Sequence, residues 1–225
     1  MNQKNHLSRI PEVMQILKKK YNPREKTTLN RMRKNKTSNS KAFKILIACL
    51  LSLRARDEST EKISEQLFKI AETPKAIAKI PTKKLEKIIF SSGHYHKKAQ
   101  TLKHVSQEIL KRFNGKVPSN REQLLSIKGI GPKTANIVLN FAYGICIIPV
   151  DVHVHVATNR LGWISTKNAE KSETELNTII PNKYKYDFNA LFVLFGREIC
   201  QTFSPKCSIC PIKQYCPRIG VKRSR

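Results

Sequence analysis

The sequence predicts an all-α protein, and two observations support this prediction. Apolar residues recur at helical spacing along most of the 225 residues, whereas no strand-like alternation of apolar and polar residues persists anywhere. A hydrophobic content of 40% is typical of a globular chain, and this length suits one large domain or two small lobes. We therefore expect a core built from helices alone.

The chain is strongly basic. Its 43 Lys and Arg residues against 16 Asp and Glu residues give a formal net charge of +27. This charge predicts a polyanionic partner, with DNA or RNA as the first choice. An anionic membrane is the alternative, but no apolar run is long enough to span a bilayer. The segment Met1–His6 lacks the apolar core of a signal peptide, so we expect an intracellular protein, in the cytoplasm or nucleoid of a prokaryote or the nucleus of a eukaryote.

Helical periodicity begins near the N-terminus. Residues 8–21 carry apolar side chains at helical spacing and predict a first helix. Residues 21–40 are basic with few large apolar side chains, and form either a solvated linker or an arm that contacts phosphates. Residues 42–53 are almost wholly apolar and predict a buried helix, in which Cys49 is expected to be a core residue without chemistry.

Three more helices are expected before the middle of the chain. Asp57 can cap a helix over residues 58–70, and Thr82 can cap a short helix. A polar loop over residues 91–98 then leads into an amphipathic helix that ends at Phe113.

The polar loop is rich in hydrogen-bond donors. His94 and His96 flank Tyr95, but no carboxylate or cysteine accompanies them, which disfavours a metal site. Contact with DNA through Tyr95 and the neighbouring lysines is the functional interpretation, and a solvated loop is the alternative.

Residues 127–139 indicate a helix end, a glycine hairpin and the start of a second helix. Gly129 and Gly131 permit a sharp turn or a close backbone approach, and the proline that follows suits the first position of a helix. Backbone N–H groups at such a turn can hold an anion, which in so basic a chain is expected to be a nucleic-acid phosphate. Lys133 follows directly, where its side chain can reach whatever the turn holds.

Helices are predicted on both sides of the hairpin. Ser119 and Glu122 form the pattern of a capping box for the helix before it, and the helix after it ends near Gly144. Two further helices are expected over residues 168–180 and 184–200.

An extended apolar segment, residues 147–150, leads to Asp151. The structural interpretation is that Asp151 caps a helix over residues 152–161. The functional interpretation is that the segment delivers a carboxylate to a reacting centre.

Four of the six cysteines, Cys200, Cys207, Cys210 and Cys216, lie within seventeen residues. In a reducing compartment such a group is expected to bind a metal centre rather than form disulfides. Zinc and a [4Fe–4S] cluster both accept four cysteines, and the chemistry of the residues does not choose between them.

Three features together resemble the endonuclease III family of the helix-hairpin-helix DNA glycosylase superfamily. They are the hairpin over residues 129–136, the segment 150–153 with Asn159 and Arg160 beyond it, and the spacing of the four cysteines. The hairpin alone is weakly specific, since many non-catalytic DNA-binding proteins use one. The resemblance covers nearly all of the chain from about residue 40 onward.

The resemblance implies two α-helical lobes around a DNA-binding cleft. One lobe is a helical barrel over residues 35–145, with the helix-hairpin-helix at about residues 120–143. The other combines residues 1–34 with 146–225 and carries the cysteine loop, residues 200–216. The resemblance also favours a [4Fe–4S] cluster over zinc, held by the four cysteines, and a monomer that binds double-stranded DNA containing damaged bases or abasic sites.

By the same resemblance, Lys133 is the nucleophile and Asp151 the essential carboxylate of a bifunctional DNA glycosylase and abasic-site lyase for oxidised pyrimidines. A base inside a duplex must be extruded before an amine can attack the sugar C1′ and form a Schiff base. The remaining residues expected to contact DNA are Gly129, Gly131, Arg54, His94, Tyr95 and His153.

The chain departs from the family pattern at several positions. The family commonly has a glutamine at Arg54, which fills the gap left by an extruded nucleotide, and places a wedging side chain in the loop of His94. Val152 replaces a threonine, and Val156 stands where arginine is common. These departures leave the catalytic pair in place and bear on the damage spectrum and the opposite-base preference.

Three other functions are considered. One is a mismatch-type or other damage-specific glycosylase, although the adenine- and thymine-mismatch branches generally lack a lysine at position 133. The others are a non-catalytic helix-hairpin-helix DNA-binding protein and an RNA-binding protein.

Overall fold

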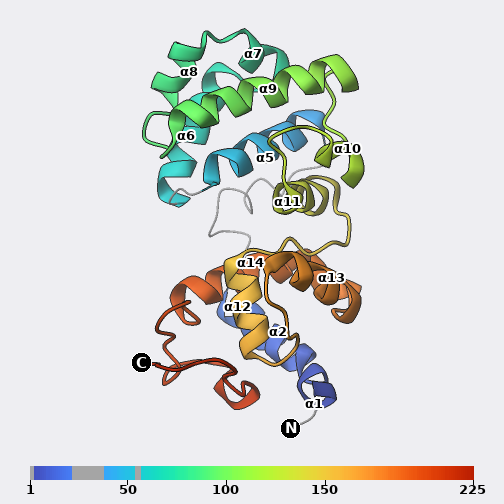
Figure 1. The fold of residues 1–225 in the computed structure, drawn as a ribbon, viewed down its shortest axis with the longest axis vertical. Helices are drawn as coiled ribbons and strands as arrows, with labels where there is room; N and C mark the ends of the chain where they lie inside the picture. The colour runs from blue at the N-terminus through green and yellow to red at the C-terminus, as the bar shows by residue number, and fades with distance from the viewer. Residues whose placement is uncertain (1–2, 22–37, 54–56) are drawn as a thin grey trace. The chain divides into compact units, whose positions relative to one another are not determined.

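The computed structural model describes residues 3–21, 38–53 and 57–225. Within these ranges all regular structure is helical, which confirms the all-α prediction (Figure 1). Arg54 and most of the basic stretch 21–40 lie outside the described residues. None of the helices in the described ranges combines the length and the apolar character that crossing a bilayer requires.

The chain divides into two compact units. One comprises Lys26–Ile145, and the other combines Met1–Glu25 with Cys146–Arg225. We call them the hairpin unit and the cysteine unit, after the motif that each contains.

The hairpin unit is built around α5 (Asn39–Ser52). Its side chains from Ala42 to Leu51, with the exception of Lys44, are buried, because a helix that is apolar on every side must be covered on every side. In Figure 1, α9 (Tyr95–Phe113) and α11 (Pro132–Tyr143) lie on opposite sides of α5, and both pack against it. The other helices of the unit are α6 (Asp57–Ile70), α7 (Pro74–Lys79), α8 (Thr82–Ile88) and α10 (Arg121–Leu125).

The cysteine unit is built around α14 (Asn182–Glu198), which packs against α2 (Ile10–Lys20) and α12 (Val152–Arg160). Its core contains Trp163, Phe188 and Phe192, and the last two rings stack with their centroids 4.4 Å apart. Aromatic rings in such contact stabilise a core beyond the area they bury. The unit also contains α1 (Gln3–Leu7), α13 (Ala169–Ile179) and a 3₁₀ turn, η1 (Lys213–Tyr215).

Side-chain caps fix where several helices begin. The Asn168 side chain accepts from the Lys171 N–H at 2.9 Å at the start of α13, whereas the helix predicted from the sequence included Asn168. For α10 the expected cap was wrong: the Asn120 side chain, rather than Ser119, accepts from the Gln123 N–H at 3.1 Å. Asparagine and serine cap equally well, so the local sequence does not choose between neighbours.

Two other helix starts differ from expectation. α8 begins with Thr82 as its first helical residue, after Pro81, and no side chain caps it. α9 begins at Tyr95, so four residues of the expected polar loop belong to the helix. His94 reverses the chain just before it with a φ of 59°, in the left-handed region that histidine enters more readily than most residues.

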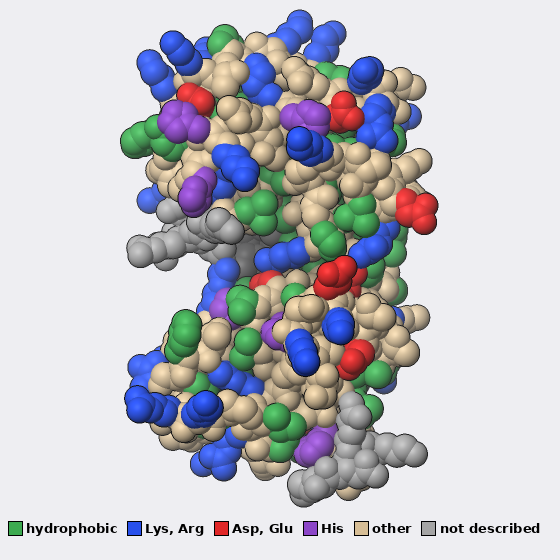
Figure 2. Space-filling view, in the orientation of Figure 1, with side chains coloured by type: hydrophobic (Ala, Val, Ile, Leu, Met, Phe, Trp, Pro, Cys, Tyr) green, Lys and Arg blue, Asp and Glu red, His purple; other side chains and the backbone are tan. Residues whose placement is uncertain are grey.

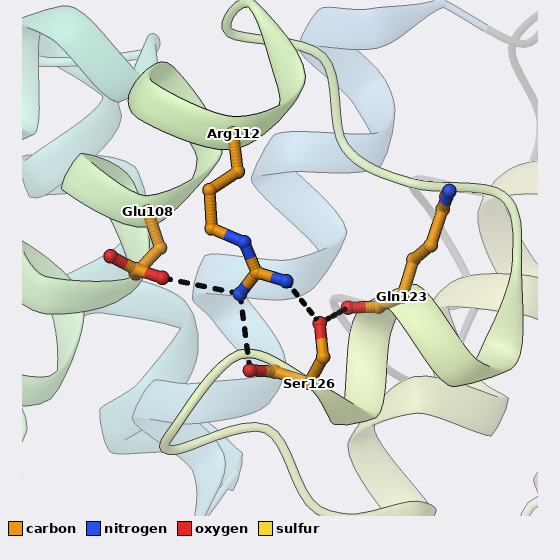
Figure 3. Close-up of polar contacts among 4 residues, drawn as sticks. All are labelled: Glu108, Arg112, Gln123 and Ser126. Carbon is orange, nitrogen blue, oxygen red and sulfur yellow. Dashed lines mark hydrogen bonds and ion pairs between the residues drawn. The ribbon is translucent and has the colours of Figure 1, made fainter.

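The segment before the hairpin is held by α9 (Figure 3). Arg112 donates to the Ser126 carbonyl oxygen at 3.2 Å and to the Ser126 hydroxyl at 2.7 Å, and also contacts Glu108 at 3.2 Å. The Ser126 hydroxyl in turn donates to the Gln123 carbonyl oxygen at 2.8 Å. These bonds tie the end of α10 to α9, and so fix the entry to the hairpin.

The hairpin itself rests on α9 through Gly129. Its φ of 104° is one that residues with side chains rarely adopt, and a Cβ here would lie 2.8 Å from Thr101 Cγ2. Gly131 differs in both respects, since its φ is −93° and a Cβ there would have no neighbour within 4 Å among the described residues. Gly129 is therefore required by the fold, whereas nothing in the packing requires Gly131.

We predict that Gly129→Ala lowers the free energy of unfolding by about 2–3 kcal/mol, because it combines left-handed strain with a steric clash. Gly131→Ala is the matched control, and its effect on stability is expected to stay within about 0.5 kcal/mol. Urea unfolding followed by circular dichroism measures both values. Equal destabilisation by the two substitutions would contradict the assigned role of Gly129.

Candidate functional site

Lys133 lies in the first turn of α11, directly after the hairpin, and its side chain is half-buried. The positive end of the helix dipole and the helix's first N–H groups are at this end. Thr134 anchors the turn to α5, since its hydroxyl accepts from the Cys49 thiol at 3.6 Å. Burial raises the pKa of this thiol, so Cys49 stays a neutral core residue beside the hairpin.

His94 and Tyr95 lie at the start of α9, and His94 lines a surface pocket that Gly129 of the hairpin also borders. His94 is exposed, and the Tyr95 ring is 4.9 Å from Phe90 and 4.0 Å from His96, measured between ring centroids. His96 Nδ1 contacts Glu86 at 3.0 Å. Among the described residues, no group of three His, Cys, Asp or Glu side chains that could hold a metal ion is found here.

Asp151 lies in the cysteine unit at the start of α12. Its Oδ1 accepts from the backbone N–H groups of His153 and Val154, each at 3.0 Å, so the expected cap is present. The extended segment before it is fixed from both sides: Asn177 accepts from the Ile148 N–H at 2.9 Å, and Asn189 donates to the Pro149 carbonyl oxygen at 2.8 Å. The fold thus places this carboxylate in one defined position.

His153 packs against a glycine that sequence reasoning missed. A Cβ on Gly196 would lie 2.7 Å from both Cβ and Nδ1 of His153, so α14 can pass only where it has no side chain. His153 Nδ1 is buried and has no hydrogen-bond partner among the described residues. A single glycine inside an otherwise regular helix is the signal that could have revealed this packing, because it weakens the helix.

The four cysteines of the loop line one pocket of the cysteine unit, together with Arg160, Lys213, Arg218 and apolar side chains. Burial raises the pKa of the Cys210 and Cys216 thiols to about 11, and raises that of Cys200 as well. In the described ranges, no three His, Cys, Asp or Glu side chains are arranged to hold one metal ion.

Arg160 holds the cysteine loop in place. It is 8% exposed, and its guanidinium donates to the carbonyl oxygens of Gln201 and Thr202 at 2.8 and 2.6 Å and to Cys200 Sγ at 3.4 Å. Its own carbonyl oxygen accepts from the Ile219 N–H at 3.2 Å. One buried cation thus supports a loop that has little core of its own, because a guanidinium can donate to several carbonyl oxygens at once.

The surface carries the charge that the composition predicts. Figure 2 shows Lys and Arg side chains scattered over the visible face, where they outnumber Asp and Glu. Such an excess attracts the phosphates of a nucleic acid over distances comparable to the Debye length.

The chain is similar to curated proteins named endonuclease III. It is 40% identical to the protein from Thermotoga maritima over 174 aligned residues. These make up 77% of this chain and 82% of the relative. The Escherichia coli K12 protein is 36% identical over 177 residues, or 79% of this chain and 84% of the relative.

Solved structures with this fold include complexes with DNA. A non-covalent endonuclease III–DNA complex superposes with a TM-score of 0.81 and 28% identity, covering 97% of this chain and 96% of that one. A trapped endonuclease III–DNA covalent intermediate gives a TM-score of 0.74 and 33% identity over 79% and 84% of the two chains.

The family description of the HhH-GPD superfamily of base excision DNA repair proteins matches residues 47–182, which include both the hairpin and Asp151. This match and the two relatives agree with the fold, the hairpin and the basic surface, and they confirm the resemblance seen in the sequence. The chain belongs to the HhH-GPD superfamily of base excision DNA repair enzymes.

Proposed function

We propose that the chain is a bifunctional DNA glycosylase and abasic-site lyase that removes oxidised pyrimidines from double-stranded DNA. The observation that carries this proposal is the lysine at position 133, placed by a rigid hairpin at the positive end of α11. Its relatives are named endonuclease III, and the covalent DNA intermediate trapped for one such protein supports a nucleophilic mechanism.

In the proposed reaction, Lys133 Nζ attacks C1′ of an extruded nucleotide. The C1′–N bond to the base breaks, and the base leaves with the electron pair and takes up a proton. Loss of a proton from nitrogen and opening of the sugar ring then give a Schiff base. Removal of a proton from C2′ expels the 3′ phosphate by β-elimination, and water releases the enzyme.

Asp151 is proposed to stabilise the positive charge that develops on the sugar as the base departs, and to assist proton transfer. The backbone of the hairpin, with Gly129 and Gly131, is proposed to hold a phosphate beside the extruded nucleotide. His94, Tyr95 and His153 are proposed as further contacts to DNA, and so is Arg54, which lies outside the described residues.

Borohydride trapping tests the nucleophile. On a duplex with one abasic site we expect a covalent adduct from the wild-type protein, and none from Lys133→Ala, since no other group of the proposal forms a Schiff base. Lys128→Ala is the matched control, because it removes an exposed lysine of the same hairpin and is expected to keep the adduct. A duplex carrying an oxidised pyrimidine should give the same adduct. An undiminished adduct from Lys133→Ala would contradict the proposed role of Lys133 as the nucleophile.

Asp151→Asn separates the cap from the chemistry. Asparagine keeps an oxygen that can accept from the N–H groups of His153 and Val154, so stability should change by less than about 0.5 kcal/mol. Excision of an oxidised pyrimidine in single turnover is expected to slow by about 100-fold or more, because the negative charge is gone. Full activity of a folded Asp151→Asn protein would show that Asp151 acts only as a helix cap. It would then favour a non-catalytic DNA-binding function for the chain.

The four cysteines are also proposed to hold a [4Fe–4S] cluster. Four partly buried thiols around one pocket fit this group, which takes one thiolate on each iron. When bound, the cluster would join the loop to the end of α14 and make the folding of the loop depend on iron.

This assignment predicts a brown protein with a broad absorption band near the blue end of the visible spectrum. Cys207→Ser should lose the band, and Arg160→Met should lower the iron content, because it removes the support of the loop. Cys146→Ser is the control, since Cys146 is exposed and lies outside the pocket. A colourless protein that contains zinc would contradict the cluster.

A further inference from the structure

Lys98 is a lysine that the fold buries. It lies in the first turn of α9, only 8% of its surface is exposed, and burial lowers its pKa. Its Nζ donates to the Leu51 carbonyl oxygen at 2.7 Å and to Ser92 Oγ at 2.8 Å. Both acceptors are neutral, and among the described residues no carboxylate pairs with this ammonium.

The two acceptors belong to different segments. Leu51 lies in the last turn of α5, where carbonyl groups have no partner within the helix and the dipole favours a cation. Ser92 lies fully buried in the turn between α8 and α9. The Lys98 ammonium therefore binds a free carbonyl oxygen at the end of α5 and also holds the turn at Ser92, which lies far from α5 in the sequence.

These bonds lie beside a surface pocket that the hairpin borders. Lys98, His94, Leu53 and Gly129 all line this pocket. His94 is tied to the same helical turn, because its carbonyl oxygen accepts from the Lys98 backbone N–H at 3.0 Å. Gly129 rests on Thr101, one turn further along α9. The end of α5, the turn before His94 and the hairpin at Gly129 are thus all held by contacts with the first two turns of α9.

Burying an ammonium among neutral groups is costly. A methionine of similar length would avoid that cost, but it would leave the Leu51 carbonyl oxygen without this donor. A direct phosphate contact does not account for the lysine, since two of its donors are used within the protein. The neighbouring Lys97 is exposed and lines the same pocket, so it is the better placed of the two to contact a phosphate.

We propose that Lys98 is a positioning residue for the recognition of damaged DNA. Its ammonium locks the end of α5 and the turn before His94 onto α9, so that the segments around the pocket meet the DNA in one arrangement. The inference rests on the proposed function only in taking DNA as the ligand of this face. We expect Lys98 to affect the discrimination between damaged and intact duplex rather than the general attraction to phosphates.

The test compares two affinities of the full-length protein, measured by fluorescence anisotropy. One duplex carries a tetrahydrofuran analogue of an abasic site, and the other is the same sequence undamaged. In Lys98→Met the preference for the analogue should fall by about tenfold, the effect of losing a charge-assisted hydrogen bond that supports the binding surface. Ser92→Ala removes only one of the two acceptors and should lower the preference less.

Lys97→Met is the matched control. It removes a neighbouring charge from the same pocket, so it should weaken binding to both duplexes alike and leave the preference unchanged. Thermal unfolding of every variant shows that folded proteins are compared. An unchanged preference in Lys98→Met, an equal fall in Lys97→Met, or no preference in the wild-type protein would each overturn the inference.

The analogue separates this inference from the proposed function. Tetrahydrofuran has no aldehyde and forms no Schiff base, so the affinity ratio is independent of Lys133 chemistry. Absence of a borohydride adduct would remove the lyase mechanism and leave the ratio interpretable. A normal adduct with an unchanged ratio in Lys98→Met would remove the role of Lys98 alone.

Discussion

The hairpin unit depends on one close approach, that of the hairpin backbone to α9 at Gly129. The positive φ of this glycine turns the chain, and the Thr101 methyl group lies where any side chain at position 129 would have to lie. Arg112 holds the entry from the same helix, and Thr134 anchors the exit on α5. Lys133 therefore projects from a frame whose parts are fixed by direct contact with α5 and α9.

Much of the fold could be predicted because its signals are local. The almost wholly apolar run of α5 leaves no alternative to a buried helix, and Asp151 precedes its helix in the position of a cap. The misplaced boundaries have a common cause. Ser119 and Asn120 are equivalent as caps, and the start of α9 depends on the left-handed turn at His94, so tertiary packing decides both.

The site divides in the same way. The hairpin, the carboxylate and the four cysteines are recognisable as residue types at characteristic spacings. The support that Lys98 and Arg160 give does not follow from such spacings, since the first acts on a carbonyl 47 residues away and the second on a carbonyl 41 residues away. A sequence shows that such residues are basic. Only the folded chain shows that they are buried, where their charged groups bind backbone carbonyl oxygens of other segments.

The division of the chain into units has a consequence for its synthesis. The hairpin unit is one continuous stretch, so all of its helices are available once residues 26–145 have left the ribosome. The cysteine unit is discontinuous: Val13, Met14 and Leu17 of α2 share a core with Phe188 and Phe192 of α14. Domains fold in the order in which they emerge. The apolar face of α2 is therefore completed only after α14 has been made, at the far end of the cysteine unit.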